Sequence, residues 1–218
     1  MIGPTRVLGP DDEQDAASLL ARAFATELGN VALYPDPAAR KAMGEAAMRG
    51  MFRTVARLGS VHGIEVDGQL GAVALWHPPG VRTGLRDVPT VLRPKLTVAP
   101  TAVRALPVAL WRTLRRPRTA VAVVWQRARA IQEVSAGPVW HLAFLGTAPE
   151  HRGRGLARRL LDRQLARCDE DGFAVWLETT DPANPPIYER FGFEVFTHLE
   201  DAAWLPGWWA MRREPRSL

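Results

Sequence analysis

The sequence predicts a single α/β domain in which helices flank a mixed β-sheet. Three observations lead to this prediction: apolar residues recur at helical spacing, two apolar strands enclose an Asp-Gly turn, and a strand, a helix and a strand follow one another over residues 139–179. The chain has 218 residues, of which 47% are hydrophobic and 23% charged, so one domain can bury a core. Length alone would also permit two small domains. We take residues 1–218 as one.

The first half of the chain contains the clearest hairpin signal. Asp67 and Gly68 join two apolar runs, and an Asp-Gly pair favours the positive φ angles of a type I′ turn. Upstream, Asp11 and Asp12 begin a helix, and Gly59 ends another. The expected elements are a strand at 5–8, a helix from Pro10 to about Thr26, a helix at 38–58, and strands at 61–66 and 69–77.

A strand-helix-strand unit dominates the second half. It comprises a strand at 139–147, a helix at 154–168 and an apolar strand at 173–179, an order that predicts parallel strands with a right-handed crossover. Residues 81–137 have a helical pattern that prolines interrupt, so we expect an insertion of short helices there and a candidate substrate lid. Trp111, Val121 and Trp125 add apolar bulk to these helices, which we expect to pack over the sheet and to form one wall of the acceptor pocket. The remaining expected elements are a short helix from Pro185 to Gly192 and strands at 193–199 and 208–212.

Composition narrows the classes of partner. The net charge is +5, but the arginines are scattered, and the densest group, between Arg112 and Arg118, is typical of a solvated helix face, so we expect no nucleic-acid partner. The five histidines lack metal-ligand spacing and Cys168 is the only cysteine, so we expect no metal and no intrachain disulfide. The chain contains no leader-like start and no run of eighteen apolar residues, which predicts a cytoplasmic protein with no membrane partner.

The segment from Arg152 to Ala157, which reads Arg-Gly-Arg-Gly-Leu-Ala, lies between the strand at 139–147 and the following helix. The start of a helix carries unpaired N–H groups and a partial positive charge, which together attract phosphate. Gly153 and Gly155 leave room for phosphate oxygens, and two arginines add charge. The segment is therefore a candidate cradle for a pyrophosphate.

Three other interpretations of this segment are possible. A Walker loop requires Lys and then Ser or Thr, where this chain has Leu156 and Ala157, so that interpretation fails. A dinucleotide fingerprint requires a small residue where Arg158 stands, although Glu178 lies at a suitable distance for the ribose carboxylate, so it remains a weaker alternative. The third is a glycine-rich turn without a ligand.

The segment also resembles the coenzyme A motif of the GNAT superfamily of N-acetyltransferases, which is Arg or Gln, two residues, Gly, one residue, then Gly or Ala. Arg152, Gly155 and Ala157 match it. From Trp140 to His198 the chain is further similar to the puromycin N-acetyltransferase-like group. The matching residues are Trp140, Gly146, Pro149, Gly153, Gly155, Leu156, Leu177, Glu178, Thr179, Asn184, Pro186, Tyr188, Glu189, Arg190, Gly192 and Phe193. The chain departs from that group at Thr147, Arg152, Ala157 and Ile187, of which the last concerns the acceptor.

The resemblance implies the GNAT acyl-CoA N-acyltransferase fold, a mixed sheet whose parallel pair splays at the cofactor site. It implies acetyl-CoA as cosubstrate and no metal, and it assigns Tyr188 as the acid that protonates the leaving thiolate. The implied cofactor-binding residues are Leu145, Gly146, Thr147, Arg152, Gly153, Arg154, Gly155, Leu156, Ala157, Arg158, Asn184 and Tyr188.

Acetyl transfer to an amine also needs a base, because an alkyl ammonium has a reference pKa of about 10.4. Glu178 ends a parallel strand, at the sheet edge where ligands bind, and its apolar neighbours favour a raised carboxyl pKa. We therefore expect Glu178 to be the base, directly or through water. The competing interpretations are a surface salt bridge for Glu178 and plain packing for Tyr188.

The sequence thus predicts an enzyme that acetylates the amine of a small molecule, such as an antibiotic-like nucleoside or an amino-sugar. The alternatives are a regulatory protein that binds acetyl-CoA without turnover and a protein N-terminal acetyltransferase. A nucleic-acid-binding module is a further class, which the scattered charge disfavours. The acceptor and the oligomeric state stay open at this point.

Overall fold

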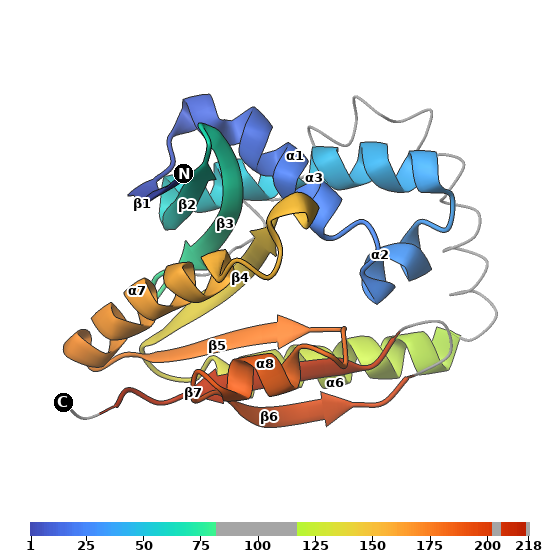
Figure 1. Cartoon of the computed structure of the whole chain (residues 1–218). Helices are drawn as coiled ribbons and strands as arrows, with labels where there is room; N and C mark the ends of the chain where they lie inside the picture. The colour runs from blue at the N-terminus through green and yellow to red at the C-terminus, as the bar shows by residue number, and fades with distance from the viewer. Residues whose placement is uncertain (82–116, 202–205, 217–218) are drawn as a thin grey trace.

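The computed structural model describes residues 1–81, 117–201 and 206–216, and its seven strands form one sheet (Figure 1). The strand order across the sheet is β1-β2-β3-β4-β5-β7-β6, in which only β4 and β5 are parallel neighbours. The mixed α/β fold predicted from the sequence is confirmed. The strands are β1 (Ile2–Val7), β2 (Ser60–Val66), β3 (Gln69–His77), β4 (Val139–Thr147), β5 (Ala174–Thr179), β6 (Glu194–Leu199) and β7 (Trp208–Arg213).

The described helices cover both faces of the sheet. Helix α7 buries its leucines against one face, together with alternate side chains of β2 to β5 such as Ala72, Ala74 and Leu177. Helices α1 and α3 cover the opposite face over β2 and β3, where Val73 and Leu75 point. Helix α6 lies on that same face over β5 and β7. The helices are α1 (Glu13–Ala23), α2 (Leu28–Leu33), α3 (Pro37–Leu58), α6 (Pro117–Val134), α7 (Leu156–Asp171) and α8 (Pro185–Glu189), with single 3-10 turns at Pro10–Asp12 and Pro149–His151.

The turns that the sequence specified locally are present. Asp67 and Gly68 have φ angles of 52° and 80°, as a type I′ hairpin between β2 and β3 requires. Asp36 caps α3 by accepting a hydrogen bond from the amide of Ala39, and a proline occupies the first position of that helix. Short-range residue chemistry therefore fixed these junctions.

Several boundaries differ from the sequence-based expectation. Strand β1 covers Ile2–Val7 rather than residues 5–8, and α8 ends at Glu189 rather than at Gly192. Helix α1 ends at Ala23 rather than near Thr26, because the side chain of Asn30 binds the carbonyl of Phe24 and a short further helix, α2, follows. Helix α7 begins at Leu156 rather than Arg154, since Gly153 and Gly155 adopt left-handed φ angles that no helix contains. It ends at Asp171 rather than Cys168, where Gly172 is also left-handed.

The expected short helices at 81–137 are wrong for the part that the structure describes. Helix α6 is continuous over 18 residues, because Pro117 occupies its first turn and no proline follows before residue 138. Val121 and Trp125 were expected to pack over the sheet, but they are 55% and 72% exposed. Trp111, the other aromatic residue expected in this wall, lies outside the described residues.

Candidate active site

The parallel pair β4 and β5 separates at the centre of the sheet. Cα register partners run from Val139 with Ala174 to Leu142 with Leu177, and no pairing continues beyond them. From there β4 stays bonded to β3 as far as Thr147, and β5 stays bonded to β7. Since alternate backbone groups of a strand point to either side, the last residues of β4 direct some N–H and C=O groups into this gap. The gap is the splay that the resemblance implied.

A cavity of about 500 Å³ lies at this gap, between the start of α7, the start of α8 and the end of α1. We call it the cofactor cavity. Of the twelve residues predicted to bind the cofactor, eight line it: Leu145, Gly146, Thr147, Arg152, Ala157, Arg158, Asn184 and Tyr188. Segments up to 43 positions apart in sequence therefore meet where the resemblance placed the coenzyme. The other four predicted residues do not line the cavity; they are Gly153, Arg154, Gly155 and Leu156.

The loop before α7 has the features of an anion site. Gly155 stands at the helix N-cap with no capping side chain, so the first-turn amides have no side-chain acceptor there. A Cβ atom at Gly153 or Gly155 would meet nothing within 4 Å, so their positive φ, rather than crowding, is what requires glycine. Leu156 is buried in the core, so its backbone alone is available to a ligand.

Gly146 has a different requirement. A Cβ atom there would lie 2.8 Å from a methyl of Leu20 and 3.2 Å from the Cβ of Ala23, both on α1. The close approach of α1 to β4 therefore explains this glycine, whereas the resemblance linked it to the cofactor. Arg152 also ties α1 to the loop, because its Nη2 donates a 3.1 Å hydrogen bond to the carbonyl of Ala23.

Tyr188 lies on α8, half-buried in the cofactor cavity, and its ring packs edge-on against Phe193 with centroids 5.8 Å apart. Burial raises the pKa of Tyr188 to about 12, so its hydroxyl stays protonated at neutral pH. Asn184 caps this short helix with its carbonyl, which accepts the amides of Ile187 and Tyr188, and its side chain donates to Thr179 Oγ1 at 2.8 Å. The position of Tyr188 is thus set by backbone and side-chain bonds of Asn184.

Glu178 lies on the other face of the sheet from Tyr188. Leu177 packs in the core beneath α7, and strand alternation turns Glu178 and Trp176 toward α6. The carboxylate accepts a 2.8 Å hydrogen bond from Trp208 Nε1. Its side chain is exposed to a cavity. Desolvation by the surrounding protein atoms raises the pKa of Glu178, while the hydrogen bond from Trp208 and the charge of Arg127 oppose that rise. The two predicted catalytic groups therefore line different cavities.

Sequence reasoning missed a second carboxylate at the site. Glu27, between α1 and α2, lines the cofactor cavity, accepts a hydrogen bond from Thr180 Oγ1, and caps α2 by accepting the amide of Asn30. Burial raises the pKa of Glu27, and the nearby Asp181 adds to that rise. Glu27 stands three residues before Asn30, which is the spacing of a helix cap, and this was the available signal. The helix that it caps has only six residues, too few to show the hydrophobic periodicity by which a helix is predicted.

Arg127 was also missed. It lies on α6 with its guanidinium carbon 5.7 Å from the centre of the Trp208 ring, and its Nη2 donates to the carbonyl of Pro206 at 2.9 Å. Its charge opposes the raised carboxyl pKa values of both Glu178 and Glu27, so the cation stands near both acids. Only the folded chain brings α6 to the end of β5.

Comparisons with known proteins agree with this geometry. Residues 121–196 match the family described as Acetyltransferase (GNAT) domain. The uncharacterised N-acetyltransferase YhbS of Escherichia coli is 38% identical over 71 residues, which cover 30% of this chain and 41% of that protein. Among the curated relatives that it matches, the chain spans 22% to 41% of their length.

Solved structures match over the whole described fold. A histone acetyltransferase HPA2-related acetyltransferase of Corynebacterium glutamicum aligns with a TM-score of 0.65 at 19% identity, over 100% of this chain and 99% of that one. Arylalkylamine N-acetyltransferase 2 of Aedes aegypti gives 0.61 at 14% identity, over 99% of each chain. A Drosophila melanogaster polyamine N-acetyltransferase that forms N-acetylagmatine gives 0.60 at 17%, over 98% and 100%. At these identities the likeness concerns the fold.

The match of residues 121–196, together with the fold and the splayed strands, supports a GNAT-superfamily N-acetyltransferase. In the part of the chain that the structure describes, no helix is long and apolar enough to cross a membrane. The same described residues contain no group of three His, Cys, Asp or Glu side chains arranged to hold a metal ion.

Proposed function

We propose that the chain transfers the acetyl group of acetyl-CoA to the primary amine of a small molecule. The observation that carries this proposal is the gap between β4 and β5, which has the cofactor cavity and Tyr188 on one face and Glu178 on the other. A thioester held in such a gap is accessible to an amine from the face opposite the coenzyme. The proposal accounts for two cavities that are both lined by residues of β4.

In the proposed binding mode, the first-turn amides of α7 and the side chain of Arg158 hold the pyrophosphate. Leu145, Gly146 and Thr147 offer backbone donors along the gap to the pantetheine arm and the thioester oxygen. The fit rests on three features of the chain: uncapped amides, two open glycines, and a cavity of suitable size beside them.

The proposed chemistry divides proton transfer between the two faces. Glu178 removes the proton from the ammonium, directly or through water, and the neutral amine attacks the thioester carbonyl. Tyr188, whose pKa of about 12 keeps it protonated, returns a proton to the departing thiolate. A raised carboxyl pKa in Glu178 favours the base role, because a stronger base accepts the amine proton more readily.

The test of this division of labour is thiol release from acetyl-CoA across small amines, with amino-terminal peptides alongside. Glu178→Gln should lower kcat by about 10²- to 10⁴-fold with little change in acetyl-CoA affinity, and Tyr188→Phe should lower kcat without a defect confined to KM. Glu170→Gln, at an exposed position on α7, is the matched control. Near-normal kcat in Glu178→Gln would move the base role to the other carboxylate, Glu27.

The same experiment separates the alternatives. Tight acetyl-CoA binding without thiol release for any acceptor would favour a regulatory protein that senses the coenzyme. A preference for peptides would favour a protein N-terminal acetyltransferase. Turnover with antibiotic-like nucleosides or amino-sugars would support the narrower substrate class that the sequence suggested.

A further inference from the structure

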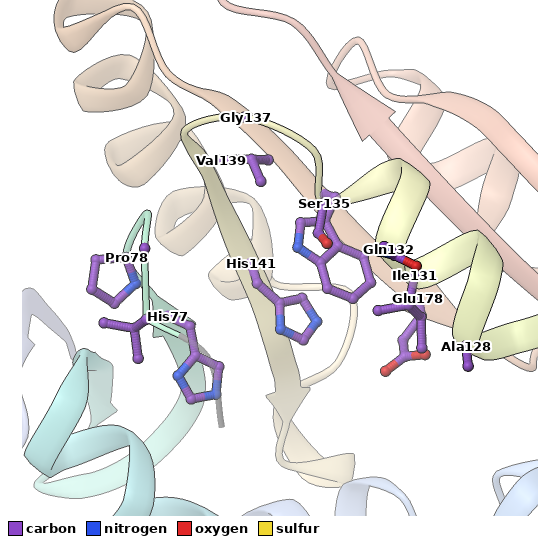
Figure 2. A pocket seen from close by; sticks show the side chains of 13 residues that line it. His77, Pro78, Ala128, Ile131, Gln132, Ser135, Gly137, Val139, His141 and Glu178 are labelled. Atoms are coloured by element: carbon purple, nitrogen blue, oxygen red, sulfur yellow. The ribbon is translucent and has the colours of Figure 1, made fainter. Parts of the chain in front are cut away.

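A second cavity, of about 590 Å³, lies on the α6 face of the sheet between the end of β3 and α6 (Figure 2). We call it the β3–α6 pocket. Its position is set by three strands and a helix that are distant in sequence. The residues that carry the following argument are His77 from β3, His141 from β4, Trp176 and Glu178 from β5, and Ala128 and Ile131 from α6.

The floor of the pocket is a row of three parallel rings. His77 is the register partner of His141, and His141 is the register partner of Trp176, so the three side chains stand side by side on one face. The ring centres of His77 and His141 are 5.8 Å apart with an angle of 19°, and those of His141 and Trp176 are 3.8 Å apart with an angle of 8°. Rings stacked in this way present their edges, rather than their faces, to the pocket.

The C–H and N–H groups on a ring edge carry partial positive charge and attract the face of another aromatic ring. A flat ligand ring lying across the floor would therefore make edge-to-face contacts with this row. The side walls are mainly aliphatic, with Ile131 and Val139 facing the cavity (Figure 2). The pocket thus suits a planar apolar body.

The carboxylate of the pocket lies at one end of it, on Glu178. Burial, assisted by His77, lowers the pKa of His141 to about 3, so this ring is neutral at physiological pH. Among the described residues that line the pocket, Glu178 is the only carboxylate, and no Lys or Arg is present. One ammonium group has a carboxylate partner here, Glu178, which also accepts from Trp208 and lies near the cation of Arg127. A second ammonium on the same molecule would have no carboxylate partner among the described lining residues.

From this arrangement, we infer that the β3–α6 pocket binds the body of the acceptor and selects a primary monoamine with a planar, uncharged body, of the arylalkylamine kind, over a polyamine. The inference rests on the proposed function, because it places the amine at Glu178 beside the gap. Ser135 and Gln132 supply polar groups at the rim, where a substituent on the ring would be hydrogen-bonded. The ligand ring lies over His141 and Trp176.

The experiment compares phenethylamine and tryptamine with putrescine and agmatine in the thiol-release assay. We expect kcat/KM for the two aromatic monoamines to exceed that for the two dications by about tenfold or more, since one unpaired buried charge is worth at least that ratio. Calorimetric titration of phenethylamine into the protein loaded with coenzyme A measures binding without turnover.

Ala128→Trp is designed to fill the pocket from α6. The matched control is Ala122→Trp, because Ala122 is exposed on the same helix but does not line the pocket. Ala128→Trp should raise KM for phenethylamine about tenfold or more while acetyl-CoA affinity stays within about twofold of the parent value, and Ala122→Trp should change neither.

The outcomes distinguish the inference from the proposed function. Turnover that prefers putrescine or agmatine, or an unchanged KM in a folded Ala128→Trp protein, would overturn the inference and leave the acetyltransferase proposal standing. Absence of thiol release with every amine would overturn the proposed function. In that case calorimetry tests binding in the β3–α6 pocket without turnover. Phenethylamine binding that is lost in Ala128→Trp and retained in Ala122→Trp would support the inference, and absence of binding to the parent protein would reject it.

Discussion

Gly155 and Gly172 flank α7 with nearly the same backbone conformation, which permits a controlled test of the anion site. Their φ and ψ angles are 74° and 14° at Gly155, and 71° and 26° at Gly172. A Cβ atom at either position would meet nothing within 4 Å. Alanine therefore introduces the same backbone strain at both ends of one helix and no steric clash at either, but only Gly155 adjoins the proposed pyrophosphate site.

The size of the effect follows from the left-handed conformation, which costs an L-residue about 1–2 kcal/mol. Each variant should lose about that much unfolding free energy, which for a chain of this size lowers Tm by about 2–4 °C per kcal/mol. The loop at Gly155 can relieve the strain by moving the first-turn amides of α7. Acetyl-CoA affinity should then fall about 5- to 30-fold in Gly155→Ala, as 1–2 kcal/mol implies, and stay unchanged in Gly172→Ala. The β-branched Gly155→Val should lose more.

The assays are thermal denaturation for stability and isothermal titration calorimetry for acetyl-CoA binding, with both variants and the parent protein in one buffer. The informative quantity is the loss of acetyl-CoA affinity in Gly155→Ala compared with that in Gly172→Ala, because global destabilisation affects both variants equally. An equal loss of affinity in both, or none in a folded Gly155→Ala protein, would refute the placement of the pyrophosphate at the start of α7.

Two further predictions concern groups that hold the site and the fold. Trp208→Phe removes the hydrogen-bond donor that opposes the rise of the Glu178 pKa. The acid limb of the kcat/KM profile should therefore shift to higher pH, because the base is then deprotonated only at higher pH. An unshifted acid limb in an active enzyme would show that Glu178 takes no part in the proton transfer. Asp169→Asn should cost about 3–5 kcal/mol of unfolding free energy in urea denaturation, because it leaves a buried arginine without its carboxylate. Arg213 is 3% exposed and donates to both carboxylate oxygens of Asp169, at 2.7 and 2.6 Å. The control Asp171→Asn, at an exposed position, should cost little. Arg213 lowers the pKa of Asp169, so this contribution should be complete above the carboxyl's unfolded pKa of about 3.8 and should be lost as the pH falls through the lower folded value; a variant as acid-stable as its parent would contradict it.

Local sequence determined those parts of the molecule whose physical cause is local. The Asp-Gly turn and the cap at Asp36 each act within a few residues, so their structures could be predicted from spacing alone. The strand-helix-strand order likewise predicted the parallel pair β4 and β5, because a crossover helix returns the chain in the same direction. The coenzyme motif was likewise identified from local spacing, although within residues 152–157 only Arg152 and Ala157 line the cavity.

Only the tertiary structure decided which groups share a cavity. Strand alternation turns Glu178 of β5 toward one face of the sheet, whereas the packing of α8 sets Tyr188 on the other, so their separation into two cavities depends on where α6 and α8 pack. Glu27 and Arg127 enter the site from the end of α1 and from α6, about 100 residues apart, and neither has a sequence pattern of its own. The row of His77, His141 and Trp176 depends on the register of three strands, which long-range pairing fixes, because each lone aromatic residue is compatible with either face until its neighbours are known.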